Sequence, residues 1–367
     1  MNILALTKYS YQGPSSRYRF YNYKKCFEKK GIYMKIKPFF SKSYFTSRNK
    51  IEKLFVVLQS YIYRFLILIN LLIFKKKYEL ILIEYELFPY FPAIFEYLLK
   101  KRDIKYIVDY DDAAFHKYDM NYNSIARPIL KFFLKNKIAK VIQYANSVIV
   151  CNNYLEQYAQ KYNHTIFRLP TVVLLDKYKR EMENFIKENN IFTIGWIGSQ
   201  TTSVYILEIL PAIEKFISKY PKVKFDLVGF DKNLLTKEKI KKYNLNIIKW
   251  KEEYEIKNIL NFDIGIMPLH NNPWSKGKCG FKLVQYMSCK KPVIASPVGI
   301  NCSLVKDTEN GFLVKNLNEW FDAFEKLYID ERLRLQMAKN NLKKIEDEFN
   351  YTKNCQQYIQ LIKNIGS

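Results

Sequence analysis

The stretch GKCGFKLVQYMSCKKPVIASPVG, residues 277–299, joins a loop that contains two glycines to a helix and then to a buried strand. Gly277 and Gly280 bracket a flexible approach to the helix, which we predict to begin near Phe281. Lys282 and Gln285 are three residues apart and share one face of the first turns. A helix start presents unpaired N–H groups and the positive end of the helix dipole, and both favour a phosphate. The stretch therefore predicts a diphosphate site with Lys282 as its cation and Gln285 near a ribose; a plain loop–helix–strand unit is the alternative.

Strand and helix patterns alternate in the same way along the rest of the chain. The predicted strands are nearly continuous apolar runs, which suit parallel strands covered by helices on both faces. We therefore predict an α/β protein with two doubly wound, Rossmann-like domains that face a cleft. The predicted strands are residues 2–6, 33–38, 80–84, 106–109 and 147–151 in the first half, and 192–197, 224–228, 247–249, 264–268 and 292–296 in the second.

A charged stretch without a strand pattern, residues 176–190, predicts the linker between the domains. This gives an N-terminal domain over residues 1–180 and a C-terminal domain over residues 191–350. Residues 351–367 are predicted to form a last helix that packs back toward the N-terminal domain.

The composition is that of a globular protein, with 49% hydrophobic and 26% charged residues, which excludes wholesale disorder. A net charge of +25 attracts polyanions such as nucleic acid, anionic lipid or phosphorylated small molecules. The six cysteines form no CxxC pair and the three histidines are scattered, so no metal site is predicted. Because the chain opens on a predicted strand instead of a secretory leader, we expect a cytoplasmic protein with reduced, buried cysteines.

Residues 54–74 form an apolar run long enough to cross a bilayer. Arg64 lies inside this run, and a central arginine costs about 2.5–3.5 kcal/mol on insertion scales, which disfavours a spanning helix. We expect a long helix half-buried in the N-terminal domain. The alternative is that one helix face enters the cytoplasmic leaflet, aided by the lysines that follow the run.

The sequence IGWIGSQTT, residues 194–202, ends a predicted strand at Gly198. Ser199, Thr201 and Thr202 are candidate N-caps for the helix that follows. Small residues at such a turn let a phosphate approach the backbone. A tight turn with an ordinary helix cap is the alternative interpretation.

Several motifs in a fixed order carry a family resemblance. The set resembles the donor-binding half of GT-B-fold glycosyltransferases, in particular the retaining family 4 (group 1) enzymes, and GPSSRYR at residues 13–19 resembles the first N-terminal loop of that family. The motifs are IGWIGSQTT (194–202), FDLVG (225–229), FDIGIMPLH (262–270), GKCGFKLVQYM (277–287), PVIASPVG (292–299) and ENGFLV (309–314).

The resemblance implies a metal-independent, retaining transferase in which Lys282 contacts the donor diphosphate. Gln285 stands where the family has the second Glu of an E-x7-E pair, and Gly277 stands where it has the first. Backbone amides before the helix would take over part of the work of that first Glu. The resemblance also places Trp250 beside the nucleobase, with a core tryptophan as the alternative. The predicted donor-binding residues are Gly198, Ser199, Trp250, Lys278, Cys279, Gly280, Phe281, Lys282 and Gln285.

Acidic residues follow a predicted strand in the motif VDYDDAAFHKYD, residues 108–119. Three acids together can hold a divalent cation, but the resemblance argues against a metal site. We predict that Asp111, Asp112 or His116 contacts the acceptor or the reacting sugar and is catalytic. In the alternative, Asp112 caps a helix and His116 only packs.

A second group of polar residues follows the first and third predicted strands. Gly13, Ser16 and Arg17 are predicted on the phosphate or acceptor side, because the guanidinium fork of an arginine suits a phosphate. Arg17 as a solvated charge is the alternative. Glu84 and Glu86, at the end of the third predicted strand, are predicted to line the acceptor side.

We therefore expect transfer of a sugar from a nucleotide-diphosphate donor, UDP- or GDP-linked, to a glycan or lipid-linked acceptor. The context implied by the resemblance is synthesis of a bacterial surface polysaccharide such as lipopolysaccharide or capsule, at the cytoplasmic face of the membrane, with the anionic membrane surface as a candidate partner. No cofactor and no nucleic-acid partner are expected. Three alternatives remain open: a nucleotide-sugar epimerase of the same fold, a basic nucleic-acid-binding protein, and a non-catalytic scaffold.

Overall fold

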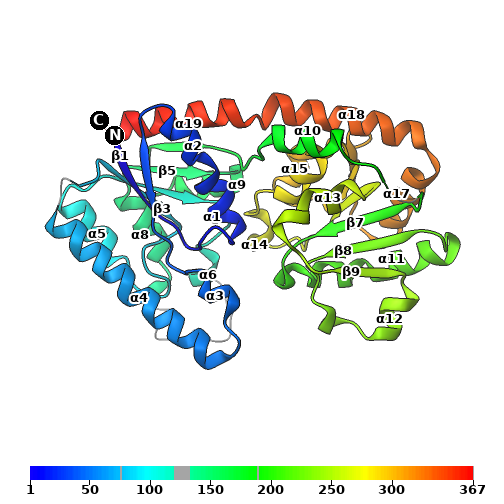
Figure 1. The fold of residues 1–367 in the computed structure, drawn as a ribbon, viewed down its shortest axis with the longest axis horizontal. Coiled ribbons are helices and arrows are strands. Elements are labelled where there is room, and N and C mark those ends of the chain that lie inside the picture. Colours follow the sequence, from blue (N-terminus) through cyan, green and yellow to red (C-terminus); the bar gives the residue numbers. More distant parts are fainter. Residues whose placement is uncertain (75–76, 120–132, 188–189, 367) are drawn as a thin grey trace. The chain divides into compact units, whose positions relative to one another are not determined.

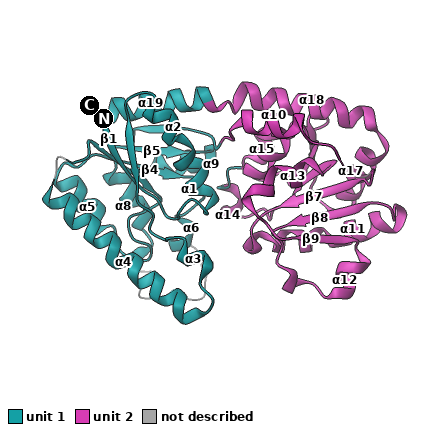
Figure 2. Ribbon diagram, viewed as in Figure 1, with its two compact units in different colours: residues 1–171, 277–279, 352–367 teal, residues 172–276, 280–351 magenta. Residues whose placement is uncertain are grey.

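The computed structural model describes residues 1–74, 77–119, 133–187 and 190–366 (Figure 1). The chain divides into two compact units (Figure 2). The first unit contains Met1–Thr171, Gly277–Cys279 and Thr352–Ser367, and the second contains Val172–Lys276 and Gly280–Tyr351. The sequence-based division instead separates residues 1–180 from 191–350 and treats 351–367 as an appended helix.

The described strands of the first unit form one sheet in which every neighbouring pair is parallel, with the order β2-β1-β3-β4-β5-β6. The five strands predicted in this half are confirmed, with ends that differ by up to two residues. The sixth strand, β6, was not predicted; it has three residues and is only partly buried, so it lacks a long apolar run. The strands are β1 (Asn2–Leu6), β2 (Tyr33–Ile36), β3 (Leu80–Glu84), β4 (Tyr106–Tyr110), β5 (Ser147–Val150) and β6 (Ile166–Arg168).

Helices pack on this sheet because its central strands are apolar on both faces. All five residues of β3 and of β4 are buried, as expected for parallel strands covered on both sides. The described helices of this unit are α1 (Pro14–Arg19), α2 (Lys24–Glu28), α3 (Ser43–Thr46), α4 (Lys50–Ile73), α5 (Ile94–Lys101), α6 (His116–Asp119), α8 (Lys137–Tyr144), α9 (Asn153–Ala159) and α19 (Tyr351–Gly366).

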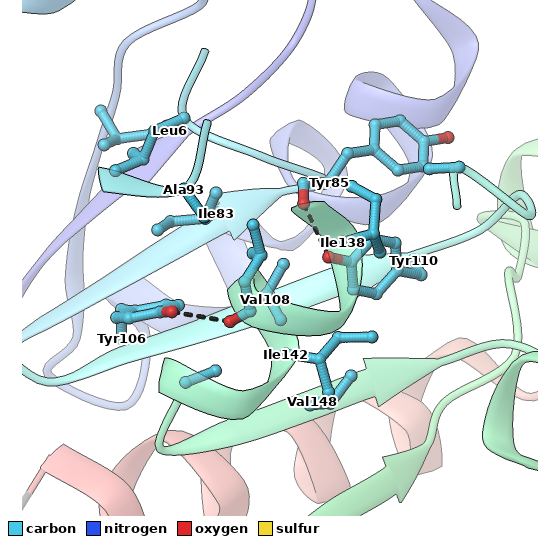
Figure 3. Packing of buried hydrophobic residues seen from close by; sticks show 14 of the residues in the cluster. Leu6, Ile83, Tyr85, Ala93, Tyr106, Val108, Tyr110, Ile138, Ile142 and Val148 are labelled. Carbon is cyan, nitrogen blue, oxygen red and sulfur yellow. Dashed lines mark hydrogen bonds between the residues drawn. The ribbon is translucent and has the colours of Figure 1, made fainter. Parts of the chain in front are cut away.

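In the core of the first unit, buried tyrosine hydroxyls donate hydrogen bonds to backbone carbonyl oxygens (Figure 3). Tyr106 donates its hydroxyl hydrogen to the carbonyl oxygen of Val141 at 2.7 Å, and Tyr110 donates to that of Tyr85 at 2.8 Å. Both rings therefore remain buried without leaving a hydroxyl unsatisfied. Fully burying an aliphatic neighbour such as Ile83 or Val108 contributes about 1.5–3 kcal/mol.

The second unit has an equivalent parallel sheet of described strands, with the order β12-β11-β10-β7-β8-β9. The five strands predicted in this half are confirmed, and only β12 was not predicted as a strand. Together the two sheets establish the doubly wound α/β fold class. The strands are β7 (Thr193–Ile197), β8 (Lys224–Val228), β9 (Leu245–Ile248), β10 (Ile264–Met267), β11 (Val293–Ala295) and β12 (Gly311–Leu313).

The stretch 176–190, predicted to be the linker, contains helix α10, Leu175–Glu183, whose Tyr178 is buried. Its charges are those of an amphipathic helix with one buried face. The other described helices of this unit are α11 (Val204–Lys219), α12 (Lys237–Lys242), α13 (Glu255–Leu260), α14 (Pro273–Lys276), α15 (Phe281–Ser288), α16 (Asn301–Leu304), α17 (Leu317–Ile329) and α18 (Glu331–Glu348).

One strand glycine, Gly265 of β10, makes room for the helix that carries the predicted diphosphate site. A Cβ on Gly265 would lie 2.4 Å from the ring of Tyr286, a residue of α15. The Tyr286 hydroxyl accepts from the backbone N–H of Ile197 at 3.0 Å and donates to the carbonyl oxygen of Ile266 at 3.3 Å. One buried side chain thus joins α15 to both β7 and β10.

The cysteines differ from the expectation that all six are reduced. Cys26 forms a disulfide with Cys355, and Cys151 forms one with Cys279. The remaining two, Cys289 and Cys302, are free thiols. Sequence spacing did not reveal these bonds, because each pair is more than one hundred residues apart in the sequence.

Candidate functional site

The start of α15 in the second unit is built around a left-handed residue. Gly280 precedes the helix with φ +65°, and a Cβ there would lie 2.3 Å from Cδ1 of Leu304. Both the backbone conformation and the close approach require glycine. The helix begins at Phe281, as predicted. No described residue accepts a hydrogen bond from the backbone N–H of Lys278, Cys279 or Gly280, so the segment leading into α15 has donors available for a ligand.

Lys282 and Gln285 lie on the first turns of α15 in different surroundings. The Lys282 ammonium is 5.2 Å from the ring centroid of Trp196, in the adjacent strand β7, and the side chain is half-buried. Gln285 is only 3% exposed, and its Nε2 donates to the hydroxyl of Tyr178 at 3.4 Å. Lys282 therefore lies at the carboxyl end of the sheet, whereas Gln285 is held against α10.

The turns after β7 and β8 approach each other through glycines. The backbone N–H of Gly198 donates to the carbonyl oxygen of Val228 at 3.0 Å. A Cβ on Gly198 would lie 2.4 Å from the Trp196 ring, and one on Gly229 would lie 2.2 Å from the Gly198 carbonyl oxygen. Trp250 follows β9 beside this turn, half-buried, and donates from Nε1 to Glu255 at 3.0 Å.

Ser199 does not cap the following helix, contrary to prediction, and neither do Thr201 and Thr202. Residues Gln200–Thr202 form a 3-10 turn instead, and the Ser199 hydroxyl lies 2.9 Å from that of Thr201. Helix α11 begins only at Val204. The turn takes up the residues that the sequence pattern assigned to the cap, which leaves Ser199 exposed at the carboxyl end of β7.

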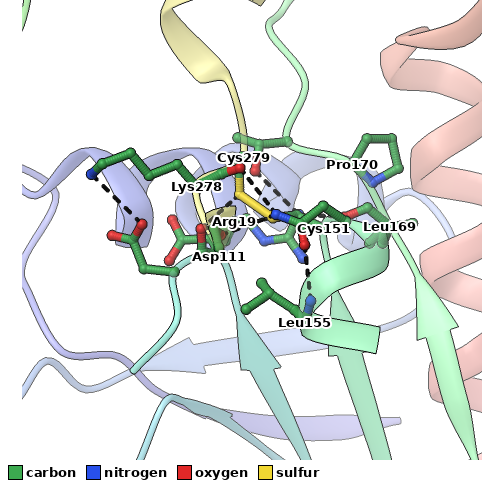
Figure 4. Close-up of a disulfide and its surroundings, with 12 residues drawn as sticks. Arg19, Asp111, Cys151, Leu155, Leu169, Pro170, Lys278 and Cys279 are labelled. Carbon is green, nitrogen blue, oxygen red and sulfur yellow. Dashed lines mark hydrogen bonds and ion pairs between the residues drawn. A yellow bond between two sulfur atoms is a disulfide. The ribbon is translucent and has the colours of Figure 1, made fainter. Parts of the chain in front are cut away.

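Residues Gly277–Cys279 belong to the first unit and are fastened to the ends of β4 and β5 (Figure 4). The amide of Asn152 donates to the carbonyl oxygens of Gly277 and Lys278, both at 3.0 Å, and Cys279 forms the disulfide with Cys151. A Cβ on Gly277 would lie 2.4 Å from that of Ala113. Gly277 is therefore required by close packing against Ala113, and it does not provide the flexible approach that the sequence predicted.

The acids after β4 have three different environments. Asp109 is buried and accepts a bidentate pair of hydrogen bonds from Arg19, at 2.9 and 2.7 Å, so it is a structural ion pair and not a ligand group. Asp111 is nearly buried and accepts from the Tyr85 hydroxyl. Asp112 is 33% exposed and lies 4.0 Å from the ammonium of Lys278. Of the three, Asp112 is the most accessible to a ligand.

His116 lies at the start of α6 among aromatic rings. It is 8% exposed, its Nε2 is 2.8 Å from the hydroxyl of Tyr154, and its ring centroid is 4.3 Å from that of Phe115. The packed environment matches the alternative interpretation of this residue. To contact a substrate, the Nε2 atom of His116 would have to give up its contact with the Tyr154 hydroxyl.

Glu84, at the end of β3, is a buried carboxylic acid that the sequence predicted only as a residue lining the acceptor side. Its Oε2 accepts from the Ser16 hydroxyl at 2.5 Å and from the backbone N–H of Lys8 at 2.7 Å. No described residue bonds to its Oε1. Burial, followed by the charge of Asp111, raises the pKa of Glu84 to about 8. At neutral pH the group is therefore mostly a neutral acid, able to donate a proton.

The residue after Glu84 is strained. Tyr85 has φ +63°, which is uncommon for a bulky residue and typical of functional sites. Its side chain contacts Asp111 through the hydroxyl. A half-buried lysine, Lys117, lies over its ring at 5.5 Å, and burial and the neighbouring charge of Lys8 lower the pKa of Lys117 to about 7. Tyr85 belongs to no motif, and Lys117 lies within the motif at residues 108–119 but was not singled out, because its burial arises only from the packing around it.

The remaining predicted residues of the first unit are buried. Arg17 is 2% exposed and lies 4.9 Å from the ring centroid of Tyr18, so its interpretation as a solvated charge is wrong. A Cβ on Gly13 would lie 2.4 Å from that of Tyr9, and this packing requires glycine.

Glu86 is surrounded by its own partners. It forms an ion pair with Lys137 and accepts from the Tyr118 hydroxyl at 2.7 Å. Although burial opposes its charge, Lys137 and Lys117 outweigh that effect and hold the pKa of Glu86 below its ordinary value. This carboxylate stabilises the loop after β3 and has little surface for an acceptor. Within the described ranges, no group of three or more His, Cys, Asp or Glu side chains is placed to hold a metal ion.

Comparison with known proteins agrees with this architecture. The profile of the family described as Glycosyl transferases group 1 matches residues 176–344. Trehalose synthase of Thermococcus litoralis is 27% identical over 173 residues, and the aligned part spans 43% of this chain but only 41% of that protein.

Solved structures show the same fold over nearly the whole chain. WaaG, a glycosyltransferase involved in lipopolysaccharide biosynthesis, has a TM-score of 0.67 and 13% identity, with 99% of each chain covered. HepE of Anabaena, solved in complex with UDP, has a TM-score of 0.63 and 15% identity, with 99% of this chain and 100% of that chain covered. The predicted resemblance to the group 1 glycosyl transferases is confirmed over residues 176–344, where the family profile matches, and the chain has the GT-B fold; the retaining family 4 assignment stays a prediction.

Proposed function

We propose that this protein transfers a sugar from a nucleotide-diphosphate donor to a glycan or lipid-linked acceptor. The observation that carries the proposal is the start of α15: a left-handed Gly280, preceding N–H groups that no described residue uses, and Lys282 on the first turn. These are the groups that bind a diphosphate at a helix N-terminus. UDP is the first nucleotide to test, because HepE was solved with UDP.

The chemistry follows from what sugar transfer demands. As the bond between sugar and diphosphate breaks, negative charge develops on the leaving diphosphate, and preorganised donors lower the barrier by stabilising that charge. Lys282 and the helix start supply such donors without a metal ion. Retention at the anomeric carbon is proposed on the strength of the family resemblance.

The first unit would supply groups for the sugar or the acceptor. Asp112 is partly exposed and close to Lys278, and Asp111 is oriented by Tyr85. Glu84 adds a neutral acid in the same polar cluster. We assign acceptor or sugar contacts to Asp112 first, with Asp111 as its neighbour, and His116 is the weaker candidate because its ring is enclosed.

The biological setting is also a proposal. Similarity to WaaG supports a role in surface polysaccharide synthesis, and the expected site is the cytoplasmic face of a membrane, where nucleotide-sugars are made. Disulfides are uncommon in the cytoplasm, so a cytoplasmic location has to be compatible with the two disulfides of this chain.

The test measures nucleotide release from a panel of UDP- and GDP-sugars by the wild-type protein and by Lys282→Ala. Removing one charge-stabilising donor is expected to lower kcat about 10²–10³-fold. Lys339→Ala is the matched control, because Lys339 is an exposed lysine of α18. Absence of binding and turnover with every donor would refute the proposal, and formation of an epimerised free nucleotide-sugar without acceptor would favour an epimerase.

A further inference from the structure

Helix α4 exposes mainly apolar side chains to solvent. Most helices on a protein surface present polar residues to water and bury apolar ones. In α4, the exposed side includes Leu54 at 70%, Leu58 at 57%, Ile62 at 54% and Leu66 at 57% exposure. The buried residues are Val56, Ser60, Arg64, Leu68 and Leu71.

Two polar residues of this helix, Ser60 and Arg64, point into the protein. Nη2 of Arg64 donates to the carbonyl oxygen of Thr7 at 2.9 Å and to that of Lys37 at 3.1 Å. The Ser60 hydroxyl donates to the carbonyl oxygen of Val56. At 100° per residue, the exposed apolar residues cover roughly 120° of the helix, on the side opposite the buried residues. The arginine that argued against a spanning helix therefore also anchors the helix to its own domain.

The apolar surface continues beyond α4. The ring centroids of Phe65 in α4 and Phe95 in α5 are 5.9 Å apart, and Figure 1 shows the two helices side by side at the edge of the first unit. Residues around the start of α5 are exposed as well, including Tyr90 at 59%, Ile94 at 49% and Tyr97 at 47%. A contiguous apolar patch of this kind marks an interaction surface.

The charges that flank the patch identify its partner. Lys50 and Lys53 are exposed at the start of α4, and Lys77 is exposed just beyond its end. In the sequence, Lys77 closes a run of three lysines, and KKR at residues 100–102 ends the α5 segment. The whole chain carries a net charge of +25. An apolar stripe bordered by cations is complementary to the acyl chains and headgroups of an anionic bilayer.

We propose that the exposed apolar stripe of α4, continued by α5, docks this protein on the surface of an anionic lipid bilayer. The helix lies along the membrane and does not cross it, because its opposite side is packed on the sheet and holds Arg64. This inference goes beyond the proposed transfer reaction and does not depend on it. Docking places the first unit at the bilayer surface, where it would meet a lipid-linked substrate that diffuses within the membrane.

The experiment is vesicle flotation with phosphatidylcholine alone and with phosphatidylcholine plus phosphatidylglycerol. The wild-type protein is expected to float with the anionic vesicles. The variant Leu58→Ser/Ile62→Ser/Leu66→Ser is expected to bind them about tenfold or more weakly, since it removes three inserting side chains. The matched control is Ile329→Ser/Leu335→Ser, which removes exposed apolar residues of the second unit, 67% and 64% exposed, and should bind as the wild type does.

Three results would overturn the inference. The first is equal flotation of the wild type and the triple variant, and the second is equal binding of the wild type to neutral and anionic vesicles. The third is a lipid-free wild-type dimer that the triple variant converts to a monomer in light scattering, because the stripe would then cover a second copy of the chain. Circular dichroism melting of all variants checks folding, which should be retained because the altered side chains are exposed.

Discussion

The backbone at Gly277 passes so close to Ala113 that a Cβ on residue 277 would lie 2.4 Å from the Cβ of Ala113 and 2.8 Å from its backbone nitrogen. The pair joins a short segment, 277–279, to the loop after β4, although 163 residues separate the two positions. The same segment leads directly into Gly280 and the start of α15.

Replacing Gly277 by alanine is therefore expected to displace this segment. Gly277→Ala should lower the free energy of unfolding by about 1–3 kcal/mol, the usual range for overpacking, and should weaken UDP binding measured by calorimetry. The second-site change Ala113→Gly removes the closest contact and should restore part of both losses. Full wild-type behaviour of Gly277→Ala would contradict the close approach.

Glu84 is expected to make stability depend on pH. Its native pKa of about 8 exceeds the value of about 4.3 in an unfolded chain. Between these values the native state holds a proton that the unfolded state has released, so the free energy of unfolding falls as pH rises, by up to about 1.4 kcal/mol per pH unit. Glu84→Gln should remove this slope in urea titrations from pH 5 to pH 8 (roughly the window between the two pKa values).

The exposed carboxylate change Glu183→Gln serves as the control for the pH experiment, and it should keep the wild-type slope. Identical slopes for the wild type and Glu84→Gln would show that Glu84 is ionised throughout this range.

The buried pair of Arg19 and Asp109 is expected to be sensitive to loss of one partner. Burial opposes the charge of Arg19, but Asp109 outweighs it and raises the pKa of the guanidinium. Asp109→Asn leaves that cation without its counter-charge and should cost about 3–5 kcal/mol of unfolding free energy. The double variant Arg19→Met/Asp109→Asn should cost clearly less than the sum of its single changes. In contrast, breaking the exposed pair of Lys24 and Glu28 by Glu28→Gln should cost less than about 1 kcal/mol.

The two disulfides predict how many cysteines are free to react with an alkylating reagent. Denatured protein treated with iodoacetamide in the absence of reductant should be labelled at Cys289 and Cys302 only, and the variant Cys289→Ser/Cys302→Ser should remain unlabelled. Reduction should lower stability by about 2–4 kcal/mol per bridge. Mass spectrometry that finds all six cysteines alkylated would contradict the pairing.

The sequence predicted the architecture because local patterns determine it. Continuous apolar runs such as residues 80–83 identify buried parallel strands without knowledge of their neighbours. The start of α15 at Phe281 was predictable for the same reason, since glycine and helix periodicity are adjacent in the chain. The short strand β6 was missed because three partly buried residues leave no such pattern.

The site was predicted less completely because its details depend on distant neighbours. The requirement for glycine at position 277 comes from Ala113, and the burial of Arg17 and Arg19 on α1 comes from the fold around them. The positive φ of Tyr85 and the raised pKa of Glu84 also arise only when the chain is packed. Such tertiary effects leave no signature in residue order.

The three-segment composition of the first unit has a consequence for synthesis on the ribosome. Its sheet is complete by residue 168, but the segments 277–279 and 352–367 that belong to the same unit emerge later. The Cys26–Cys355 bond cannot close until residue 355 has left the exit tunnel. The first unit, although its synthesis begins first, is therefore completed only after the second unit has been synthesised, and nascent chains should remain accessible to chaperones until residue 355 has emerged.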